Sequence, residues 1–468
     1  MSELRGWARH EDAVTRLRSS YAEIPAGAPV RLAKRTTNLF RPRAATTAPG
    51  LDVGGLDGVI AVDPIARTAD VQGMCTYEKL VDATLPFGLI PYVVPQLRTI
   101  TLGGAVTGLG IESTSFRNGL PHESVLEMDI FTGAGEVVTA TPDNEHAELF
   151  ATFPNSYGSL GYATRLRIEL EAVPSNVLLH HVRFDDAGVL AKTIAEIAAT
   201  RRFDDGPHSI AVDGLDGVAF APGEYYLTLA SWSETADREP SDYTGQRIYY
   251  RSIQELAGPG RHTDGTDLLT MHDYLWRWDT DWFWCSGAFG AQHRLLRRLW
   301  PRRWRRSDVY MKFIALDRRF DIADRLDARA GRPLRERVIQ DIEVPVENLP
   351  AFLEWFDEEI GMRPVWLCPL VAHRRWPTYP LEPDRLYVNV GFWGTVHVGP
   401  DAVDAPRNRA IEAKVHELGG HKSLYSEAFY DRATFDALYD GEHLAAVKAI
   451  YDPDDRLTSL YDKAVKRR

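Results

Sequence analysis

The sequence predicts an α+β protein with more than one domain, and three observations support this prediction. The chain of 468 residues is long enough for two or three domains with sizeable cores. In its first third, short β-like runs are joined by both helical segments and hairpins, which is unlike a regular βαβ array. After Pro174 the pattern changes, and a second region mixes helices, strands and many aromatic residues.

The first region begins with an amphipathic helix, in which Trp7, Val14 and Leu17 have roughly helical spacing. A polar loop follows at 31–50, and a Gly-Ala-Gly turn at 133–135 indicates a hairpin. The elements predicted in this region are helices at 1–22, 76–88 and 143–153, and strands at 58–63, 67–72, 90–94, 124–132, 135–140 and 165–173.

The second region begins with a strand and a helix, continues through an aromatic-rich middle, and ends in strands that surround another helix. From about residue 407 the chain returns to helical patterns. The elements predicted here are strands at 180–186, 338–345, 364–371 and 385–393, and helices at 189–202 and 348–361. The sequence therefore divides near residues 175 and 406.

Composition excludes several classes of protein. A net charge of −12 argues against a general nucleic-acid surface. The three cysteines are scattered and odd in number, so they predict neither a disulfide framework nor a metal site, and a reducing cytoplasm is expected. The charged start does not resemble a signal peptide, and no run approaches the ~20 apolar residues of a membrane span. We expect a cytoplasmic protein with, at most, peripheral contact at the inner face of the membrane.

The segment TITLGGAVTGLGIESTSFRNG, residues 99–119, is rich in glycine. Its spacing fits neither the dinucleotide fingerprint nor the Walker loop, which needs a Gly-Lys-Ser/Thr sequence. It predicts either a loop whose N–H groups bind an anion, with hydroxyls from Ser113, Thr114 and Ser115, or a tight loop without a ligand. The polar loop KRTTNLF at 34–40 is a second anion-binding candidate. Two such loops converging on one diphosphate would suit a flavin dinucleotide.

Several blocks of sequence occur in the order found in one flavoprotein family. They are VVPQLRTITLGGAVTGLGIESTSFRNGL (93–120), PNSYGSLGYATRLRIEL (154–170), IQDIEVPVENL (339–349), PVWLCPL (364–370), LYVNVGFWG (386–394) and LYDKAVK (460–466). With these blocks the chain resembles the FAD-linked oxidase superfamily, the vanillyl-alcohol-oxidase-like flavoproteins, and within it is similar to the Δ24-sterol reductases.

The resemblance implies a PCMH-type FAD-binding domain of two subdomains at residues 1–175. It also implies a mixed α/β cap domain at 176–406 and a C-terminal segment, 407–468, that returns to the FAD domain. The loops at 34–40 and 93–119 contain no His or Cys for a covalent link, so non-covalent FAD is expected. The implied FAD-binding residues are Arg35, Thr36, Thr37, Asn38, Leu39, Thr101, Leu102, Gly103, Gly104, Ala105, Gly108, Gly110, Ile111, Glu112, Ser113, Ser115 and Gly161.

The sterol-reductase resemblance implies reduction of an isolated carbon–carbon double bond with hydride from the flavin and NADPH as the reductant. Such a bond needs a positioned acid and an apolar pocket. Glu112 is the first candidate acid, its alternative role being to organise the loop. Tyr425 matches the family pattern, or is a packed tyrosine. His421 and Lys422 are candidates for proton donor or flavin counter-charge, or belong to a surface turn.

Two further segments indicate contact with lipid. The aromatic residues Tyr274, Trp276, Trp278, Trp282, Phe283 and Trp284 either line a lipid tunnel or form core. The segment HRLLRRLWPRRWRR, 293–306, carries seven arginines and an apolar stripe that includes Leu295 and Leu299. It predicts a peripheral membrane contact through Arg294–Arg306, its alternatives being a solvated helix face or a site for an acidic partner.

The preferred substrate is a 10-methylene fatty acyl chain on phospholipid. The arginine-rich composition suggests an actinobacterium-like source, and similar flavoproteins act in tuberculostearic-acid (10-methyl fatty acid) synthesis beside a methyltransferase, a potential partner. Unlike the animal and plant sterol enzymes, this protein is expected to lack an N-terminal membrane anchor. The alternatives are a Δ24-sterol or steroid side-chain reductase, an oxygen-using oxidase or sugar-alcohol dehydrogenase, and a lipid-presenting subunit of a methyltransferase complex.

Overall fold

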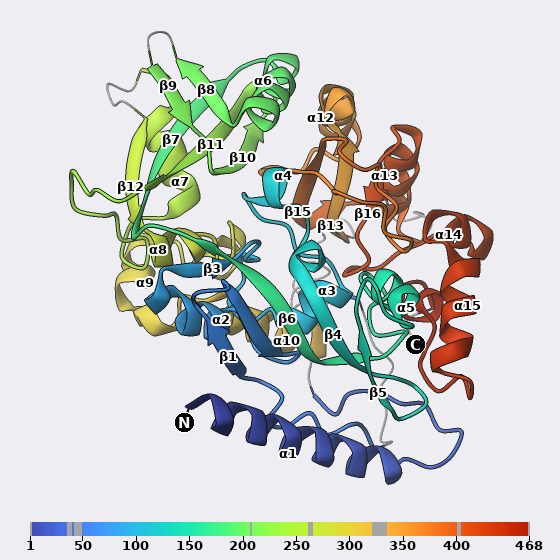
Figure 1. Cartoon of the computed structure of the whole chain (residues 1–468). Helices are drawn as coiled ribbons and strands as arrows, with labels where there is room; N and C mark the ends of the chain where they lie inside the picture. The colour runs from blue at the N-terminus through green and yellow to red at the C-terminus, as the bar shows by residue number, and fades with distance from the viewer. Residues whose placement is uncertain are drawn as a thin grey trace.

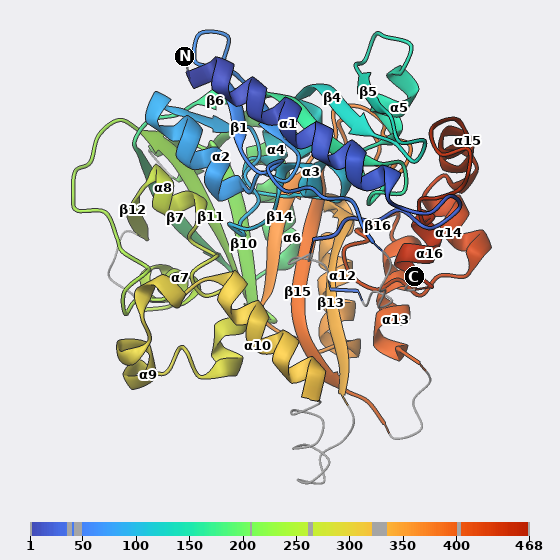
Figure 2. The same cartoon turned by 90° about the horizontal axis from the view of Figure 1, so that it is seen from below.

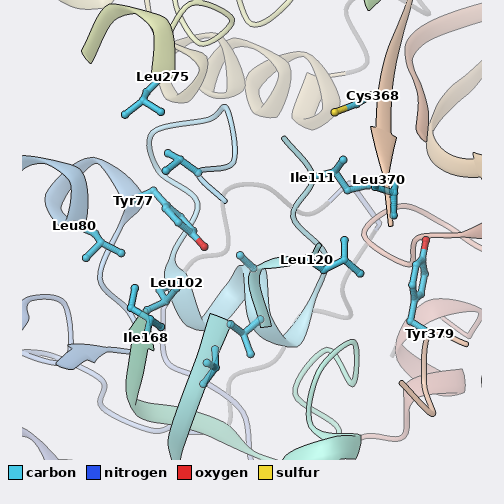
Figure 3. Packing of buried hydrophobic residues seen from close by; sticks show 14 of the residues in the cluster. Tyr77, Leu80, Leu102, Ile111, Leu120, Ile168, Leu275, Cys368, Leu370 and Tyr379 are labelled. Atoms are coloured by element: carbon cyan, nitrogen blue, oxygen red, sulfur yellow. The ribbon is translucent and has the colours of Figure 1, made fainter. Parts of the chain in front are cut away.

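The computed structural model describes residues 2–34, 40–41, 49–205, 208–260, 265–320, 335–399 and 404–466. Two large antiparallel sheets form its framework, one from each region of the sequence (Figure 1). A continuous apolar core joins them. Figure 3 shows this core, in which Leu102 and Ile168 of the first region share one cluster with Cys368 and Leu370 of the second.

The first sheet has six strands, in the order β1-β2-β6-β4-β5, with β3 paired to β6. The hairpin predicted at 133–135 joins β4 to β5. Helix α1 (Ser2–Ala22) packs against β1 through its apolar stripe, in which Leu17 is buried. The strands are β1 (Val59–Asp63), β2 (Thr68–Gln72), β3 (Leu89–Pro91), β4 (Val125–Phe131), β5 (Val137–Ala140) and β6 (Tyr162–Ala172).

The second sheet has eight strands in the order β12-β7-β11-β10-β14-β15-β13-β16, and Figure 2 shows its central strands side by side. They are β7 (Asn176–Phe184), β10 (Gly214–Ala221), β11 (Glu224–Ser233), β12 (Thr266–Thr270), β13 (Arg335–Pro345), β14 (Val365–Leu370), β15 (Tyr387–His397) and β16 (His421–Lys422). A separate pair consists of β8 (Arg202–Asp205) and β9 (His208–Ala211).

The two faces of the second sheet have different partners. Side chains alternate between faces along a strand, so Ile342 of β13 and its partner Val390 of β15 lie on one face. This face packs against α6 (Ala187–Thr200) and α12 (Leu349–Glu359), and both residues are fully buried there. The neighbouring positions, Asp341 and Gly391, lie on the opposite face. That face is free of these helices and is available for a site between the two regions.

The chain crosses between the sheets at 173–175, close to the predicted boundary at 175. The C-terminal segment divides its contacts. Helix α13 (Pro406–Glu417) and β16 belong to the second sheet, because α13 contacts β13 and β16 pairs with it. Helix α15 (Gly441–Tyr451) contacts α5 (Ala147–Thr152) of the first region (Figure 1), and α14 (Arg432–Leu438) contacts both α15 and α16 (Leu460–Ala464). The return to the first domain thus begins after residue 422 rather than at 407.

Seven α-helices remain in the described part of the chain, and all of them except α10 have nine residues or fewer. They are α2 (Tyr77–Thr84), α3 (Leu102–Thr107), α4 (Ser115–Asn118), α7 (Tyr249–Ala257), α8 (Met271–Leu275), α9 (Arg294–Leu299) and α10 (Ser307–Phe320). Among the described residues, no helix has the length and apolar content needed to cross a bilayer.

Candidate active site

A cavity of about 260 Å³ lies between the two regions. The glycine-rich segment forms one wall, and the second sheet forms another through Asp341, Trp366 and Trp393. Trp282 and Phe283 also line it; they belong to the aromatic block, the six aromatic residues singled out between Tyr274 and Trp284. The cavity thus collects residues from segments that lie hundreds of positions apart in the sequence.

Two glycines of this wall are required by close packing. A Cβ atom on Gly103 would lie 2.6 Å from the carbonyl oxygen of Gly73, and one on Gly110 would lie 2.8 Å from ring atoms of both Pro95 and Pro121. Separations under ~3 Å force the backbone to move, because real side chains do not tolerate them. Some glycines of this segment are therefore explained by close packing against neighbouring backbone and ring atoms rather than by contact with a ligand.

The predicted FAD-binding residues divide into those that line the cavity and those that support it. Thr101, Gly103, Gly104, Gly108, Gly110 and Ile111 line it. Leu102, Ala105, Glu112, Ser113, Ser115 and Gly161 do not, and the first five of these are buried behind the wall. Gly161 has a φ of +135°, and a Cβ there would lie 2.5 Å from the carbonyl oxygen of Phe131, so its role is to permit a tight turn.

The second predicted loop reaches the same cavity at both of its described ends. Lys34, Phe40 and Arg41 line it. Arg35, Thr36, Thr37, Asn38 and Leu39 lie outside the described residues. Convergence of the two loops on one cavity agrees with the geometry predicted for a flavin dinucleotide, and the two cations provide positive charge beside the glycine wall.

Two buried polar side chains in the cavity lining have no hydrogen-bond partner inside the protein. They are Gln96, whose amide nitrogen and oxygen are both unpaired, and Ser423, whose hydroxyl is unpaired. Buried polar groups are almost always hydrogen-bonded, so an unpaired amide facing a cavity indicates a polar ligand. The edge of an isoalloxazine ring, with N–H and C=O groups, fits this requirement. Sequence reasoning missed both residues, although Gln96 lies within the block quoted above.

Tyr425 and Asp341 form a polar pair in the cavity wall. The Tyr425 hydroxyl accepts a hydrogen bond of 2.9 Å from Nε1 of Trp393 and faces the Asp341 carboxyl. Enclosure of Asp341 away from bulk water raises its pKa to about 7, although hydrogen bonds from Asn389 and Tyr425 oppose the shift. Tyr425 was a predicted candidate, whereas Asp341 was not. Asp341 carries the single carboxyl group among the described residues that line the cavity.

Glu112 does not line the cavity. Its Oε1 lies 3.1 Å from a guanidinium nitrogen of Arg277, and that nitrogen lies 3.0 Å from Oδ2 of Asp216 on β10. All three residues are almost fully buried. Glu112 therefore ties the end of the glycine-rich segment to the second region, which corresponds to its predicted alternative as a loop-organising carboxylate, with Arg277 as the partner.

The predictions for Lys422 and His421 need correction, because neither lines the cavity. The Lys422 ammonium is buried and donates to Glu412 at 2.6 Å, which joins β16 to α13. His421 is buried between the rings of Tyr379 and Tyr439, and burial lowers its pKa to about 3. It is therefore neutral and not available as an acid near neutral pH. Both were expected as proton donor or flavin counter-charge, with a surface turn as the alternative, but both are buried and contact other partners.

The aromatic block is divided between cavity and core. Trp282 and Phe283 line the cavity, while Tyr274, Trp276 and Trp278 are buried in the core. Trp284 packs against Trp393, one layer behind the lining, with ring centroids 5.5 Å apart. The tunnel predicted from six aromatic residues is thus a cavity wall made from two of them.

Comparison with known proteins agrees with this geometry. Residues 10–141 match the family described as FAD binding domain. The chain is 24% identical over 452 residues to Delta(24)-sterol reductase of Arabidopsis thaliana, covering 89% of this chain and 77% of that protein. It is 23% identical to the Homo sapiens Delta(24)-sterol reductase, covering 89% and 76%. A shorter match, 33% identical over 124 residues, is to Cytokinin dehydrogenase 3 of Oryza sativa subsp. japonica and covers 26% and 23%.

The α+β fold, the glycine-walled cavity and the matched domain together define an FAD-dependent oxidoreductase. Within this class, the domain match at 10–141 and the similarity to Δ24-sterol reductases over 89% of the chain support the resemblance to the FAD-linked oxidase superfamily that the sequence blocks predicted.

Proposed function

We propose that this protein reduces an isolated carbon–carbon double bond of a lipid, with NADPH as the source of hydride. The observation that carries the proposal is the character of the cavity. Aromatic side chains of Trp282, Phe283, Trp366 and Trp393 line it, and the described lining contains one carboxyl group. An apolar wall suits a hydrocarbon chain and excludes water, and the single acid suits a reaction that needs one proton. The resemblance over 89% of the chain to proteins named Delta(24)-sterol reductase supports the same chemistry.

When bound, FAD supplies hydride from its N5 atom. The residues positioned to hold it are the glycine wall, the unpaired Gln96 and Ser423, and the cations Lys34 and Arg41. The protein's own contribution is to orient the alkene against the aromatic wall and to provide a proton. A simple alkene is a poor hydride acceptor, so protonation has to accompany hydride transfer.

A 10-methylene acyl chain on phospholipid remains our preferred substrate, and a Δ24-sterol fits the relatives equally well. Both alkenes give tertiary-cation character on protonation, so one arrangement of acid and hydride donor serves either. The phospholipid is favoured by the exposed arginine-rich segment at 293–306. A partner methyltransferase would supply that 10-methylene group.

The arginine-rich segment forms an exposed amphipathic face. Leu295, Leu296 and Leu299 of α9 are 65%, 49% and 80% exposed, and Trp304 lies close by in sequence at 48%. Arg294, Arg298, Arg302 and Arg303 are also exposed. Two of the seven arginines instead turn inward, because Arg297 pairs with Asp281 and Arg305 donates to backbone carbonyls. Apolar side chains beside cations match the surface of an anionic phospholipid membrane, which we propose as the occupant.

Replacing two leucines of this face tests the membrane contact. We expect Leu295→Asp/Leu299→Asp to weaken binding to phosphatidylglycerol-containing vesicles by more than about tenfold, since each buried leucine contributes ~1.5–3 kcal/mol. Co-sedimentation measures the binding. Ile65 and Ile450, exposed on a β-turn and on α15, supply the matched control Ile65→Asp/Ile450→Asp, which should bind as the unaltered protein does. Equal binding by both double variants would contradict the proposal.

An anaerobic experiment tests the function. The purified holoprotein is reduced with NADPH, and 10-methylene phospholipid or a Δ24-sterol is added while flavin absorbance is followed. Reoxidation by one of the alkenes supports the proposal and identifies the substrate class. Failure of both alkenes together with rapid reoxidation by oxygen would indicate an oxidase, and failure of reduction by NADPH would favour a lipid-presenting subunit.

A further inference from the structure

We propose that Asp341 is the acid that protonates the alkene, and that Tyr425 and Gly391 position its carboxyl group. This inference rests on the proposed function and deepens it. The catalytic candidates expected from sequence were Glu112, Tyr425, Lys422 and His421, and only Tyr425 lines the cavity. The position of the proton donor is therefore open, and Asp341 is the carboxylic acid that the described cavity wall provides.

The sheet register explains why the carboxyl fits there. Asp341 of β13 is paired with Gly391 of β15, which is in turn paired with Trp366 of β14. The three residues thus form one row across the sheet, on the face that lines the cavity. A Cβ atom on Gly391 would lie 2.5 Å from Oδ1 of Asp341. The glycine leaves the space that the carboxyl occupies, between a strand and an aromatic wall.

Tyr425 fixes the direction of the carboxyl. Its hydroxyl accepts the Trp393 indole hydrogen, so its own hydrogen is free to point toward Asp341. Burial raises the pKa of the Tyr425 hydroxyl well above its usual value, so the tyrosine is a weaker acid than Asp341. Tyr425 is therefore a positioning residue, and Asp341 holds the transferable proton.

The surroundings of Asp341 keep that proton available near neutrality. Facing it are Tyr425, the Tyr157 ring and Cys368 of β14, with Glu343 two residues along its own strand. A cation, Arg41, lies over the Tyr157 ring, 5.0 Å from its centroid. Burial raises the pKa of Asp341 to about 7, so the carboxyl is largely protonated below that pH and loses its proton above it.

The proton step balances as follows. The O–H bond of the Asp341 carboxyl breaks and a C–H bond forms at the less substituted alkene carbon, leaving Asp341 as a carboxylate. The hydride that completes the alkane comes from the flavin, which NADPH has reduced. The carboxylate regains a proton from water after the product leaves.

The test compares Asp341→Asn with Glu343→Gln. Glu343 is a fully buried residue on the same strand, its partner is Tyr379, and it does not line the cavity. We expect both variants to bind FAD and to be reduced by NADPH at the unaltered rate. Reoxidation by the alkene should fall about 10²- to 10⁴-fold in Asp341→Asn alone, the usual contribution of a general acid. For the unaltered protein this step should slow about tenfold per pH unit above the pKa, and the slope should vanish in Asp341→Asn.

Infrared titration of the FAD-free protein gives a readout independent of turnover. A protonated-carboxyl band with a midpoint near 7 should be present in the unaltered protein and in Glu343→Gln, and absent in Asp341→Asn. If the asparagine variant does not fold, Asp341→Glu provides the test. It keeps an acid, so reoxidation by the alkene should be slower but should show the same dependence on pH.

Asp341→Asn reoxidised by the alkene at the unaltered rate would overturn this inference alone. If neither alkene reoxidises the unaltered protein, the proposed function fails and the inference falls with it.

Discussion

Gly104→Leu will leave the protein folded but unable to retain FAD. Gly104 is exposed in the cavity wall, and a Cβ there meets only the Thr101 hydroxyl, at 2.8 Å. A leucine side chain would therefore project into the space that the cofactor occupies. We expect the affinity for FAD to fall about 100-fold or more, equivalent to ~2.7 kcal/mol, measured by titrating FAD-free protein and following flavin fluorescence. The fold should tolerate the change, because leucine favours helix over glycine by about 1 kcal/mol.

Gly399→Leu is the matched control, since nothing lies within 4 Å of a Cβ at that exposed position. It should bind FAD normally. Gln96→Leu gives an independent check, because it removes the unpaired amide that the cofactor would satisfy. It should weaken FAD binding while raising the stability of the FAD-free protein by ~1–3 kcal/mol. If Gly104→Leu binds FAD as tightly as Gly399→Leu does, the cavity described above is not the flavin site.

Arg277→Met will lower the free energy of unfolding by ~3–5 kcal/mol, because it leaves two buried carboxylates without a counter-charge. Arg277 is 2% exposed and lies between Glu112 of the first region and Asp216 of the second. Nε1 of Trp278 and Nε1 of Trp366 also bond to Asp216, at 2.9 and 3.2 Å. The loss of stability should grow as pH rises. Without a counter-charge, the two buried carboxyl groups ionise less readily in the folded protein than in the unfolded chain. Urea denaturation measures the effect.

Arg302→Met supplies the control for charge removal, since Arg302 pairs with Asp242 at an exposed site and should cost less than ~1 kcal/mol. The triple variant Arg277→Met/Glu112→Gln/Asp216→Asn should recover much of the lost stability, because neutral amides are cheaper to bury than unpaired charges. Equal effects of Arg277→Met and Arg302→Met would show that the buried triad does not hold the two regions together.

The sequence predicted the strands well and the site only in part, for identifiable reasons. In the run VIQDIEVP, alternation correctly indicates a strand with Ile342 and Val344 on one face. On the same reasoning, Asp341 and Glu343 belong to a polar face that would ordinarily point to solvent. That face meets the first region, where Tyr157 lies near Asp341, and no local pattern reveals a contact between residues so far apart in the sequence.

The arginine segment shows the same limit. The membrane contact predicted at Arg294–Arg306 included all seven arginines of the segment, but Arg297 and Arg305 are buried. The partner of Arg297 is Asp281, which precedes the segment, and the partners of Arg305 include the Gly245 carbonyl. Helix periodicity identified the exposed leucines correctly, whereas the inward arginines depended on tertiary neighbours. The strand predicted at 90–94 ends early, at Pro91, because the chain turns there toward the cavity residues Pro95 and Gln96.

The order in which the chain leaves the ribosome has a consequence for cofactor loading. Residues that line the cavity run from Leu32 to Tyr425, and the Lys463 ammonium of α16 donates to the backbone carbonyls of Tyr157 and Gly158 beside it. A nascent polypeptide therefore has no finished flavin pocket until the residues up to Lys463 have been synthesised. Every shorter intermediate must remain intact without its cofactor.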